Sequence, residues 1–346
     1  MRALVYESFA GPMTVREEPA PAVPRGGVLI RVGASGICRS DWHGWQGHDP
    51  DIALPHVPGH ELAGTIESVG PDVRGWQVGA RVTVPFVCGC GRCDRCAAGD
   101  QQVCEHQTQP GFTHWGSFAE RVAVEAADVN LVALPDELSF AVAASLGCRY
   151  GTAFRAVVHQ GRVRPGEWVA VHGCGGLGLS AIQVAVAAGA RVVAVDIAPG
   201  ALELARALGA QEAVDSRGLD SEAVAGAVRT VTAGGAHLSL DALGSPDTCI
   251  GSVSCLRARG RHVQVGLLPP ELGRPAVPMD RAVALELELL GSHGMPAHAY
   301  PEMLGLIASG RLQPERLITR ELALDEAPAA FAGLGSVPGI AVVTRF

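Results

Sequence analysis

Four cysteines in one short segment have the spacing of a closed metal site. Cys90, Cys93, Cys96 and Cys104 form a C-x2-C-x2-C-x7-C pattern. Four thiolates complete a tetrahedral zinc shell and leave no position for a substrate, so such a site is structural. The alternative, a loop of unligated thiols, fits this number and spacing poorly. Cys88 lies outside the register, and we interpret it as a spare thiol, with substitution for Cys90 as the alternative.

A second set of possible metal ligands lies upstream. Cys38 follows Gly-Ile and precedes Arg-Ser-Asp, whereas His60 and Glu61 form the end of Pro-Gly-His-Glu. A single thiol or histidine is usually part of a packed core. Here a soft and a borderline ligand lie beside carboxylates, Asp41 and Glu61, that could orient them. A mixed Cys/His site of this kind is typical of metal-assisted catalysis.

A glycine-rich hexapeptide begins directly after an apolar run and opens a helical pattern. Its residues are Gly173, Cys174, Gly175, Gly176, Leu177 and Gly178, which fit G-x-G-x-x-G. Asp196 ends the next apolar run, 18 residues after Gly178, where an acid can accept the ribose hydroxyls of a dinucleotide. Because a 2′-phosphate would meet this carboxylate and Ile197 follows in place of an arginine, the sequence predicts NAD in preference to NADP.

The elements that carry these motifs fall into two groups. Short β-type runs punctuated by Gly and Pro occupy 28–118 and predict a compact, barrel-like β domain. After 165–167, buried strands alternate with helices, which indicates a doubly wound parallel sheet. The expected strands are 168–172, 191–196, 211–214, 238–240, 260–265 and 287–290, and the expected helices 177–188 and 201–208. We expect a helix at 300–309 and a last strand at 339–344 that return to the first domain. The predicted fold is α/β, with a catalytic domain of 1–150 and 291–346 and a Rossmann domain of 151–290.

Composition limits the functional classes. The chain has 346 residues, 48% of them hydrophobic and 18% charged, as expected for a globular protein large enough for two domains. A net charge of -8 without a basic run argues against nucleic acid as a partner. No apolar stretch is long enough to span a bilayer, and the first residues lack the pattern of a secretory signal. We therefore expect a cytoplasmic protein whose thiols stay reduced.

Together these motifs make the chain resemble the zinc-dependent medium-chain alcohol dehydrogenases, from Met1 to Phe346. The resemblance implies a GroES-like catalytic domain and two zinc ions per chain. It implies that Cys38, His60 and Cys148, the last in Leu-Gly-Cys-Arg-Tyr-Gly-Thr, bind the catalytic zinc, with Glu61 as a further or exchanging ligand. Three permanent ligands leave the fourth position for water or alcohol.

The resemblance also implies roles for neighbouring side chains. Ser40 matches the hydroxyl that accepts the alcohol proton, His43 the distal member of the proton relay, and Arg39 a side chain that approaches the cofactor pyrophosphate. Trp42, Phe86 and Trp115 match segments that line the substrate pocket, although some of these aromatic residues could only pack the β domain. The arginine that many relatives have after Gly291-Ser292 is missing, and His298 is its possible substitute.

The implied reaction is reversible, NAD-linked oxidation of primary or secondary alcohols to aldehydes or ketones, with medium-chain or aromatic alcohols favoured. A polyol or sugar-alcohol dehydrogenase of the same superfamily is the alternative. A non-catalytic NAD-binding protein and a zinc-ribbon nucleic-acid module are more remote. The resemblance further implies a homotetramer, with a dimer as the alternative.

Overall fold

The computed structural model describes residues 1–268, 273–335 and 337–346, and the chain divides into two compact units. The first unit comprises Met1–Gly151, Gly294–Gly305 and Ile318–Phe346. The second unit comprises Thr152–His293 and Leu306–Leu317. The mixed α/β class predicted from the sequence is confirmed.

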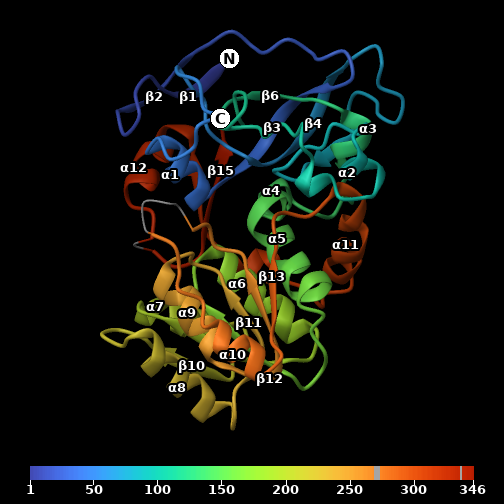
Figure 1. Cartoon of the computed structure of the whole chain (residues 1–346). Coiled ribbons are helices and arrows are strands. Elements are labelled where there is room, and N and C mark those ends of the chain that lie inside the picture. The colour runs from blue at the N-terminus through green and yellow to red at the C-terminus, as the bar shows by residue number, and fades with distance from the viewer. Residues whose placement is uncertain (269–272, 336) are drawn as a thin grey trace. The chain divides into compact units, whose positions relative to one another are not determined.

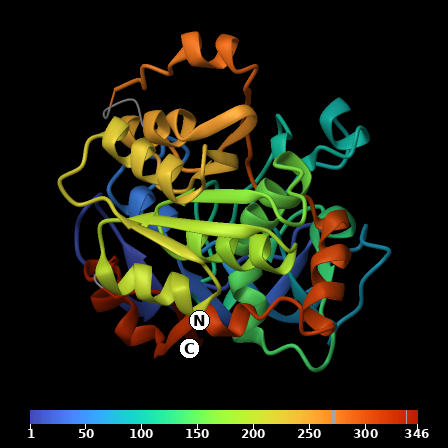
Figure 2. The same cartoon turned by 90° about the horizontal axis from the view of Figure 1, so that it is seen from below.

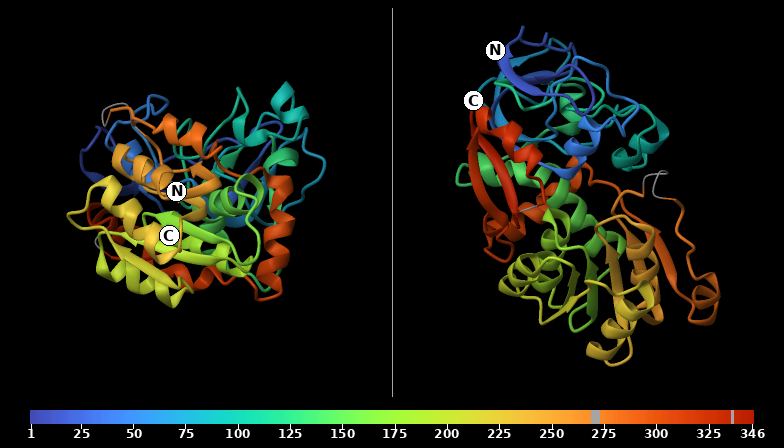
Figure 3. Two further views of the ribbon diagram at one scale, coloured as in Figure 1. Left: turned by 60° about the horizontal axis from the view of Figure 1, so that its bottom comes forward. Right: turned by 90° about the vertical axis from the view of Figure 1, so that its left-hand side faces the viewer.

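The first unit is built on a seven-stranded sheet, in which β14, β15, β3, β4, β5 and β7 follow one another and β6 also pairs with β3 (Figure 1). Its strands are β3 (Val28–Ile37), β4 (Glu61–Val69), β5 (Arg81–Thr83), β6 (Arg121–Val124), β7 (Val132–Ala133), β14 (Ile318–Ala323) and β15 (Ile340–Arg345). The strands β1 (Arg2–Tyr6) and β2 (Met13–Glu17) form a separate antiparallel hairpin. Figure 3 shows the late strands β14 and β15 side by side, in red.

β3 pairs with β4, β6 and β15, and its alternate residues enter one core. Val28, Ile30 and Val32 point to one core together with Leu62 and Ile66 of β4. Short helices connect the strands: α1 (Arg39–Trp45), α2 (Asp94–Ala97), α3 (Ala127–Asn130), α4 (Phe140–Ser145) and α12 (Ala327–Ala332). A π-helical turn, η2 (Leu146–Tyr150), follows α4 and leads through α5 (Gly151–Phe154) into a second π-helical turn, η3 (Arg155–Gln160).

The second unit is a six-stranded parallel sheet with the strand order β10-β9-β8-β11-β12-β13. The strands are β8 (Trp168–His172), β9 (Arg191–Asp196), β10 (Glu212–Asp215), β11 (Ala236–Asp241), β12 (Leu256–Gln264) and β13 (Glu288–Gly291). The helices are α6 (Gly176–Ala187), α7 (Pro199–Ala207), α8 (Ser221–Val231), α9 (Pro246–Ser254) and α10 (Met279–Ala284). Figure 2 shows α6 and α7 on one face of this sheet and α8 and α9 on the other. Cover on both faces explains the uninterrupted Val and Ala runs of β8 and β9.

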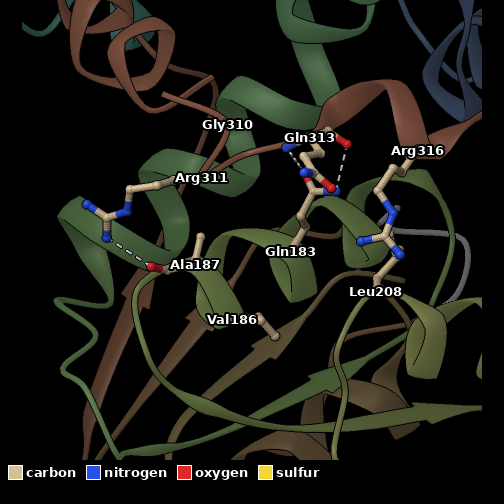
Figure 4. A pocket seen from close by; sticks show the side chains of 8 residues that line it. All are labelled: Gln183, Val186, Ala187, Leu208, Gly310, Arg311, Gln313 and Arg316. Carbon is tan, nitrogen blue, oxygen red and sulfur yellow. Dashed lines mark hydrogen bonds between the residues drawn. The ribbon is translucent and has the colours of Figure 1, made fainter. Parts of the chain in front are cut away.

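One segment near the C-terminus lies with a different unit than the sequence suggested. Residues 306–317, the end of α11 (Tyr300–Ala308) and the turn after it, belong to the second unit. The Gln183 side chain donates a 2.8 Å hydrogen bond to the Gln313 carbonyl and accepts a 3.0 Å bond from the Gln313 amide (Figure 4). Arg311 donates to the carbonyl of Ala187 at the end of α6. These polar contacts hold 306–317 against α6.

Candidate active site and metal centres

Three chain segments bring Cys38, His60 and Cys148 together in the first unit. Cys38 caps the N-terminus of α1 directly after β3, His60 directly precedes β4, and Cys148 lies in the π-helical turn η2. Antiparallel pairing of β3 and β4 aligns Gly36 with Glu61 and so brings their ligand-bearing ends side by side. The ligand atoms of the three residues all lie within 4.8 Å of one another. This set has the composition of a catalytic zinc site with three protein ligands.

The histidine of this set is oriented for metal binding. His60 is fully buried, and its Nδ1 donates a 2.7 Å hydrogen bond to Asp41 Oδ1. Its Nε2 atom is buried and has no hydrogen-bond partner among the described residues. A buried ring nitrogen without a partner is costly, whereas a lone pair fixed by a carboxylate on the opposite nitrogen suits a zinc ligand. The residues present therefore fit a bound zinc ion.

Electrostatics distinguish the two thiols. The hydrogen bond from Cys148 lowers the pKa of Cys38 well below its usual value, and the charge of Arg149 acts in the same direction. The same hydrogen bond, together with burial, raises the pKa of Cys148. Burial is the largest influence on His60 and disfavours its charged form, but the charge and hydrogen bond of Asp41 together with the Cys38 thiol outweigh burial and raise the His60 pKa. Zinc binding must displace the protons that these ligands carry.

Glu61 is turned toward a buried arginine. Its Oε1 accepts 2.9 Å hydrogen bonds from the backbone amide and from Nε of Arg149, and its Oε2 accepts one from Nη2. The group of ligand atoms within 4.8 Å does not include Glu61. A role of Glu61 as a further or exchanging metal ligand stays a prediction.

Cys90, Cys93, Cys96 and Cys104 form the second group of ligand atoms, again within 4.8 Å of one another. Backbone amides of Cys90 and His106 donate 3.3 Å hydrogen bonds to the Cys104 sulfur. Amide donors, that of Arg92 first, lower the pKa of Cys90 to about 6, which favours the thiolate form that zinc binds. All ten cysteines are free, and Cys88 packs in the core of the first unit. This loop fits a closed structural zinc site.

The two residues predicted to form the proton relay lie on α1, Ser40 in its first turn and His43 in its last. The Ser40 hydroxyl lies 3.8 Å from the Cys38 sulfur, next to the ligand set. His43 lies three positions further along the helix, hence on the same side. Its Nδ1 is 3.0 Å from Nδ1 of His48, a second, exposed imidazole that the sequence analysis did not single out. Arg39 is exposed and stacks over the Trp42 ring at 4.8 Å.

Aromatic rings flank the histidine ligand. The Phe86 ring centroid lies 6.1 Å from that of His60, and the Phe112 centroid lies 5.2 Å from it. Phe112 was not predicted, because a lone aromatic residue after a Gly-rich loop carries no signal of its own. Trp115 instead packs beside Ala3, Val5, Val57 and Ala119 and donates a hydrogen bond to the Pro55 carbonyl, which is a packing role. Exposed His298 lies beside Gly99 in the first unit.

The glycine-rich loop of the second unit joins the carboxyl end of β8 to α6. The Gly173 amide bonds to the Val195 carbonyl, with a φ of +91° that favours glycine. A Cβ on Gly178 would lie 1.8 Å from the Gly173 carbonyl oxygen, so the loop and helix approach closely only because this residue is glycine. Asp196 Oδ2 accepts a 2.6 Å bond from the Cys174 amide, and Oδ1 accepts one from Ala198. The acid is thus held at the loop that the motif assigns to the dinucleotide.

Comparisons with known proteins agree with this site. Residues 24–136 match the alcohol dehydrogenase GroES-like domain, and residues 176–309 match the zinc-binding dehydrogenase family. An alcohol dehydrogenase of Geobacillus stearothermophilus is 37% identical over 90% of each chain. Alcohol dehydrogenase TADH from Thermus sp. ATN1 covers the whole of both chains with 33% identity and a TM-score of 0.91.

Two similar structures contain nicotinamide cofactors. An alcohol dehydrogenase from E. coli CFT073 in complex with NADH is 26% identical over 99% of both chains, with a TM-score of 0.87. A zinc-binding dehydrogenase from Sinorhizobium meliloti 1021 bound to NADP is 28% identical over 99% of both chains, also with a TM-score of 0.87. Among the described residues no helix is both long and apolar enough to cross a membrane. With both domain models matched and a relative this similar over nine-tenths of its length, the chain belongs to the zinc-dependent medium-chain alcohol dehydrogenase family.

Proposed function

We propose that this protein catalyses the reversible, NAD-linked oxidation of medium-chain or aromatic alcohols to aldehydes or ketones. The observation that carries the proposal is the set Cys38, His60 and Cys148, with Ser40 beside Cys38 and with Nε2 of His60 buried and without a hydrogen-bond partner in the part of the chain that the structure describes. Three ligands next to a hydroxyl provide the two functions that alcohol oxidation requires: a metal with an open position and a proton acceptor.

Cys38, His60 and Cys148 would hold the catalytic zinc, and the four-cysteine loop would hold a structural one. When bound, zinc would supply Lewis acidity that makes an alcohol hydroxyl more acidic, and NAD would supply the oxidising power of the reaction. Asp41 fixes the His60 ring through Nδ1. As Ser40 Oγ takes the alcohol proton, it releases its own hydroxyl proton toward His43, which passes a proton to solvent.

The cofactor preference rests on Asp196. Its carboxylate is held at the glycine-rich loop by the Cys174 and Ala198 amides, where ribose hydroxyls can donate to its remaining lone pairs. Ile197 is 63% exposed and offers no positive charge to a 2′-phosphate. Both features support NAD over NADP.

The substrate class rests on the rings beside His60. Phe86 and Phe112 present apolar surface to the histidine ligand. Each methylene buried against such surface contributes about 0.8 kcal/mol, roughly a fourfold gain, whereas extra hydroxyls would remain unpaired. Because Glu61 is bonded to Arg149, Cys148 would be the third metal ligand in place of Glu61. A cysteine as the third ligand favours an alcohol over a polyol as the substrate.

The test is NADH formation by the purified protein with a panel of alcohols, with zinc content measured on the same sample. We expect higher kcat/KM for hexanol and benzyl alcohol than for ethanol, glycerol or sorbitol, and no turnover by Cys38→Ala. Sorbitol as the best substrate would establish the polyol alternative. Zinc-replete protein that oxidises none of these alcohols would overturn the proposal.

A further inference from the structure

A single buried arginine contacts all three segments that carry the catalytic metal ligands. Arg149 is only 8% exposed, and its partner Glu61 is fully buried. Its Nη1 donates a 2.9 Å hydrogen bond to the Ile37 carbonyl, and its Nε and backbone amide donate 2.9 Å bonds to Glu61 Oε1. Its remaining nitrogen, Nη2, bonds to Glu61 Oε2.

Each partner of this guanidinium is the chain neighbour of a metal ligand. Ile37 precedes Cys38, Glu61 follows His60, and Arg149 itself follows Cys148. The hydrogen bonds span 88 and 112 residues of sequence, so they join segments that the backbone alone does not connect. Arg149 therefore fixes the spacing of the three ligands to one another.

The space for this ion pair depends on a glycine. A Cβ on Gly36 would lie 2.3 Å from Glu61 Oε2 and 3.0 Å from Arg149 Nη2. The strand β3 thus leaves room for the carboxylate and the guanidinium side by side. The pair is a built feature of this site, because any other residue at Gly36 would displace one of its members.

Removal of the arginine would leave a buried carboxylate without a counter-charge. Such a group is strongly unfavourable and either takes up a proton or finds another cation. Glu61 adjoins His60, so the nearest cation would be the metal at Cys38, His60 and Cys148. A carboxylate is an acceptable zinc ligand, and it would fill the fourth position that a substrate needs.

We propose that Arg149 is a positioning residue that holds the Glu61 carboxylate out of the metal coordination shell and so keeps the fourth position open for the substrate. This inference rests on the proposed function, since it requires a metal at the three-ligand site. It gives Glu61 a defined resting state, in which both oxygens are bonded to Arg149 and neither to the metal.

The test uses the full-length protein loaded with Co²⁺, whose visible absorption reports the number and type of its ligands. The four-cysteine site, being closed, contributes a constant spectrum in every variant. Imidazole is the probe for the open position. Its binding is measured from the shift that it causes in the absorption bands of the catalytic site. We expect Arg149→Gln to change these bands without imidazole and to raise the imidazole Kd about tenfold or more.

Three further variants complete the test. The double variant Arg149→Gln/Glu61→Gln should restore wild-type bands and imidazole affinity, since the competing carboxylate is gone. Arg149→Lys keeps the charge but loses the planar fork, and it should show an intermediate effect. The control Arg261→Gln removes a similarly buried arginine from an ion pair in the second unit, with Glu167 at 2.6 Å, and should leave the bands unchanged.

Two outcomes would overturn the inference but would not contradict the proposed function. One is an Arg149→Gln protein, with two cobalt ions per chain, whose bands and imidazole affinity equal those of the wild type. The other needs no arginine variant: if Glu61→Gln alone changes the wild-type bands, Glu61 is a ligand in the resting state. Binding of a single cobalt ion per chain in the wild type would instead refute the proposed function and the inference together.

Discussion

Asp41→Asn is the most direct test of how the catalytic metal site is held together. The Asp41 carboxylate accepts three hydrogen bonds: Oδ1 from His60 Nδ1 at 2.7 Å and from the Gly59 amide at 3.1 Å, and Oδ2 from the Cys38 amide at 3.1 Å. The side chain is 1% exposed, so water cannot replace these bonds. Asp41 therefore links the backbone of two ligand segments and orients the ring of one ligand.

The magnitude follows from the number of bonds that an amide can keep. Its oxygen can still accept from His60 and Gly59, but its NH2 group would face the Cys38 amide, so one buried donor loses its partner. The cost is about 1–3 kcal/mol in the free energy of unfolding, and zinc affinity should fall about 10- to 100-fold because the neutral amide orients His60 less firmly. Asp41→Ala would leave all three donors without an acceptor. The cost in the free energy of unfolding would be about 3–9 kcal/mol, which approaches the whole stability of a typical domain.

The assay has two parts, both on Asp41→Asn and the wild type. Urea unfolding followed by fluorescence measures stability, and competition with a chromophoric chelator measures zinc affinity at each of the two sites. The control is Asp128→Asn, where an exposed carboxylate accepts bonds from the Arg74 and Gly75 amides at 3.0 and 2.8 Å. It should change stability little and zinc affinity not at all. If the zinc affinity of the catalytic site in Asp41→Asn stays within twofold of the wild-type value, this account of the site is refuted.

Four other substitutions separate the remaining roles. Cys38→Ala should reduce the zinc content from two ions to one per chain and abolish turnover in a folded protein, and equal zinc content in Cys38→Ala and wild type would contradict the ligand assignment. Cys93→Ser should instead lower the melting temperature, because a structural zinc contributes folding free energy. Asp196→Gly should weaken NAD binding by about 1–3 kcal/mol and narrow the gap to NADP, as measured by fluorescence titration with both cofactors; a wild type with higher kcat/KM for NADP would disprove the reading of Asp196. His43→Gln should slow alcohol oxidation more at low pH than at high pH, since solvent hydroxide replaces the relay only when it is abundant; a uniform loss across the pH profile would indicate a packing role.

Much of the second unit could be predicted because its signals are local. The apolar runs at 168–172 and 191–196 coincide with β8 and β9, and the helix expected at 177–188 is α6 within one residue at each end. Helices α8 and α9 were not predicted. Their starts are marked only by the capping residues Asp220 and Ser245, which in a sequence also look like ordinary loop residues.

The two groups of side chains that could hold a metal were identified in the sequence for a different reason, namely that Cys and His in tight spacing have few other uses. The partners that orient them were not. Arg149 and Glu61 are 88 residues apart, and nothing in either segment marks them as a pair. The same holds for Phe112 against His60 and for His48 beside His43, because each contact depends on how α1 and the loops fold over β3 and β4. Spacing identifies ligands, but only tertiary structure identifies what holds them.

The strand β15 has a consequence for the order in which the two metal sites can form during synthesis. It is the last strand of the chain, yet it pairs with β3, with Ala341 opposite Ile37 next to Cys38. The cysteines of the four-cysteine loop, by contrast, lie within fifteen residues of one another in the sequence and so leave the ribosome in close succession. The four-cysteine loop of a nascent chain can therefore close around a metal ion early, whereas β3, the strand that leads into Cys38, gains its final neighbour only after the whole second unit has been made.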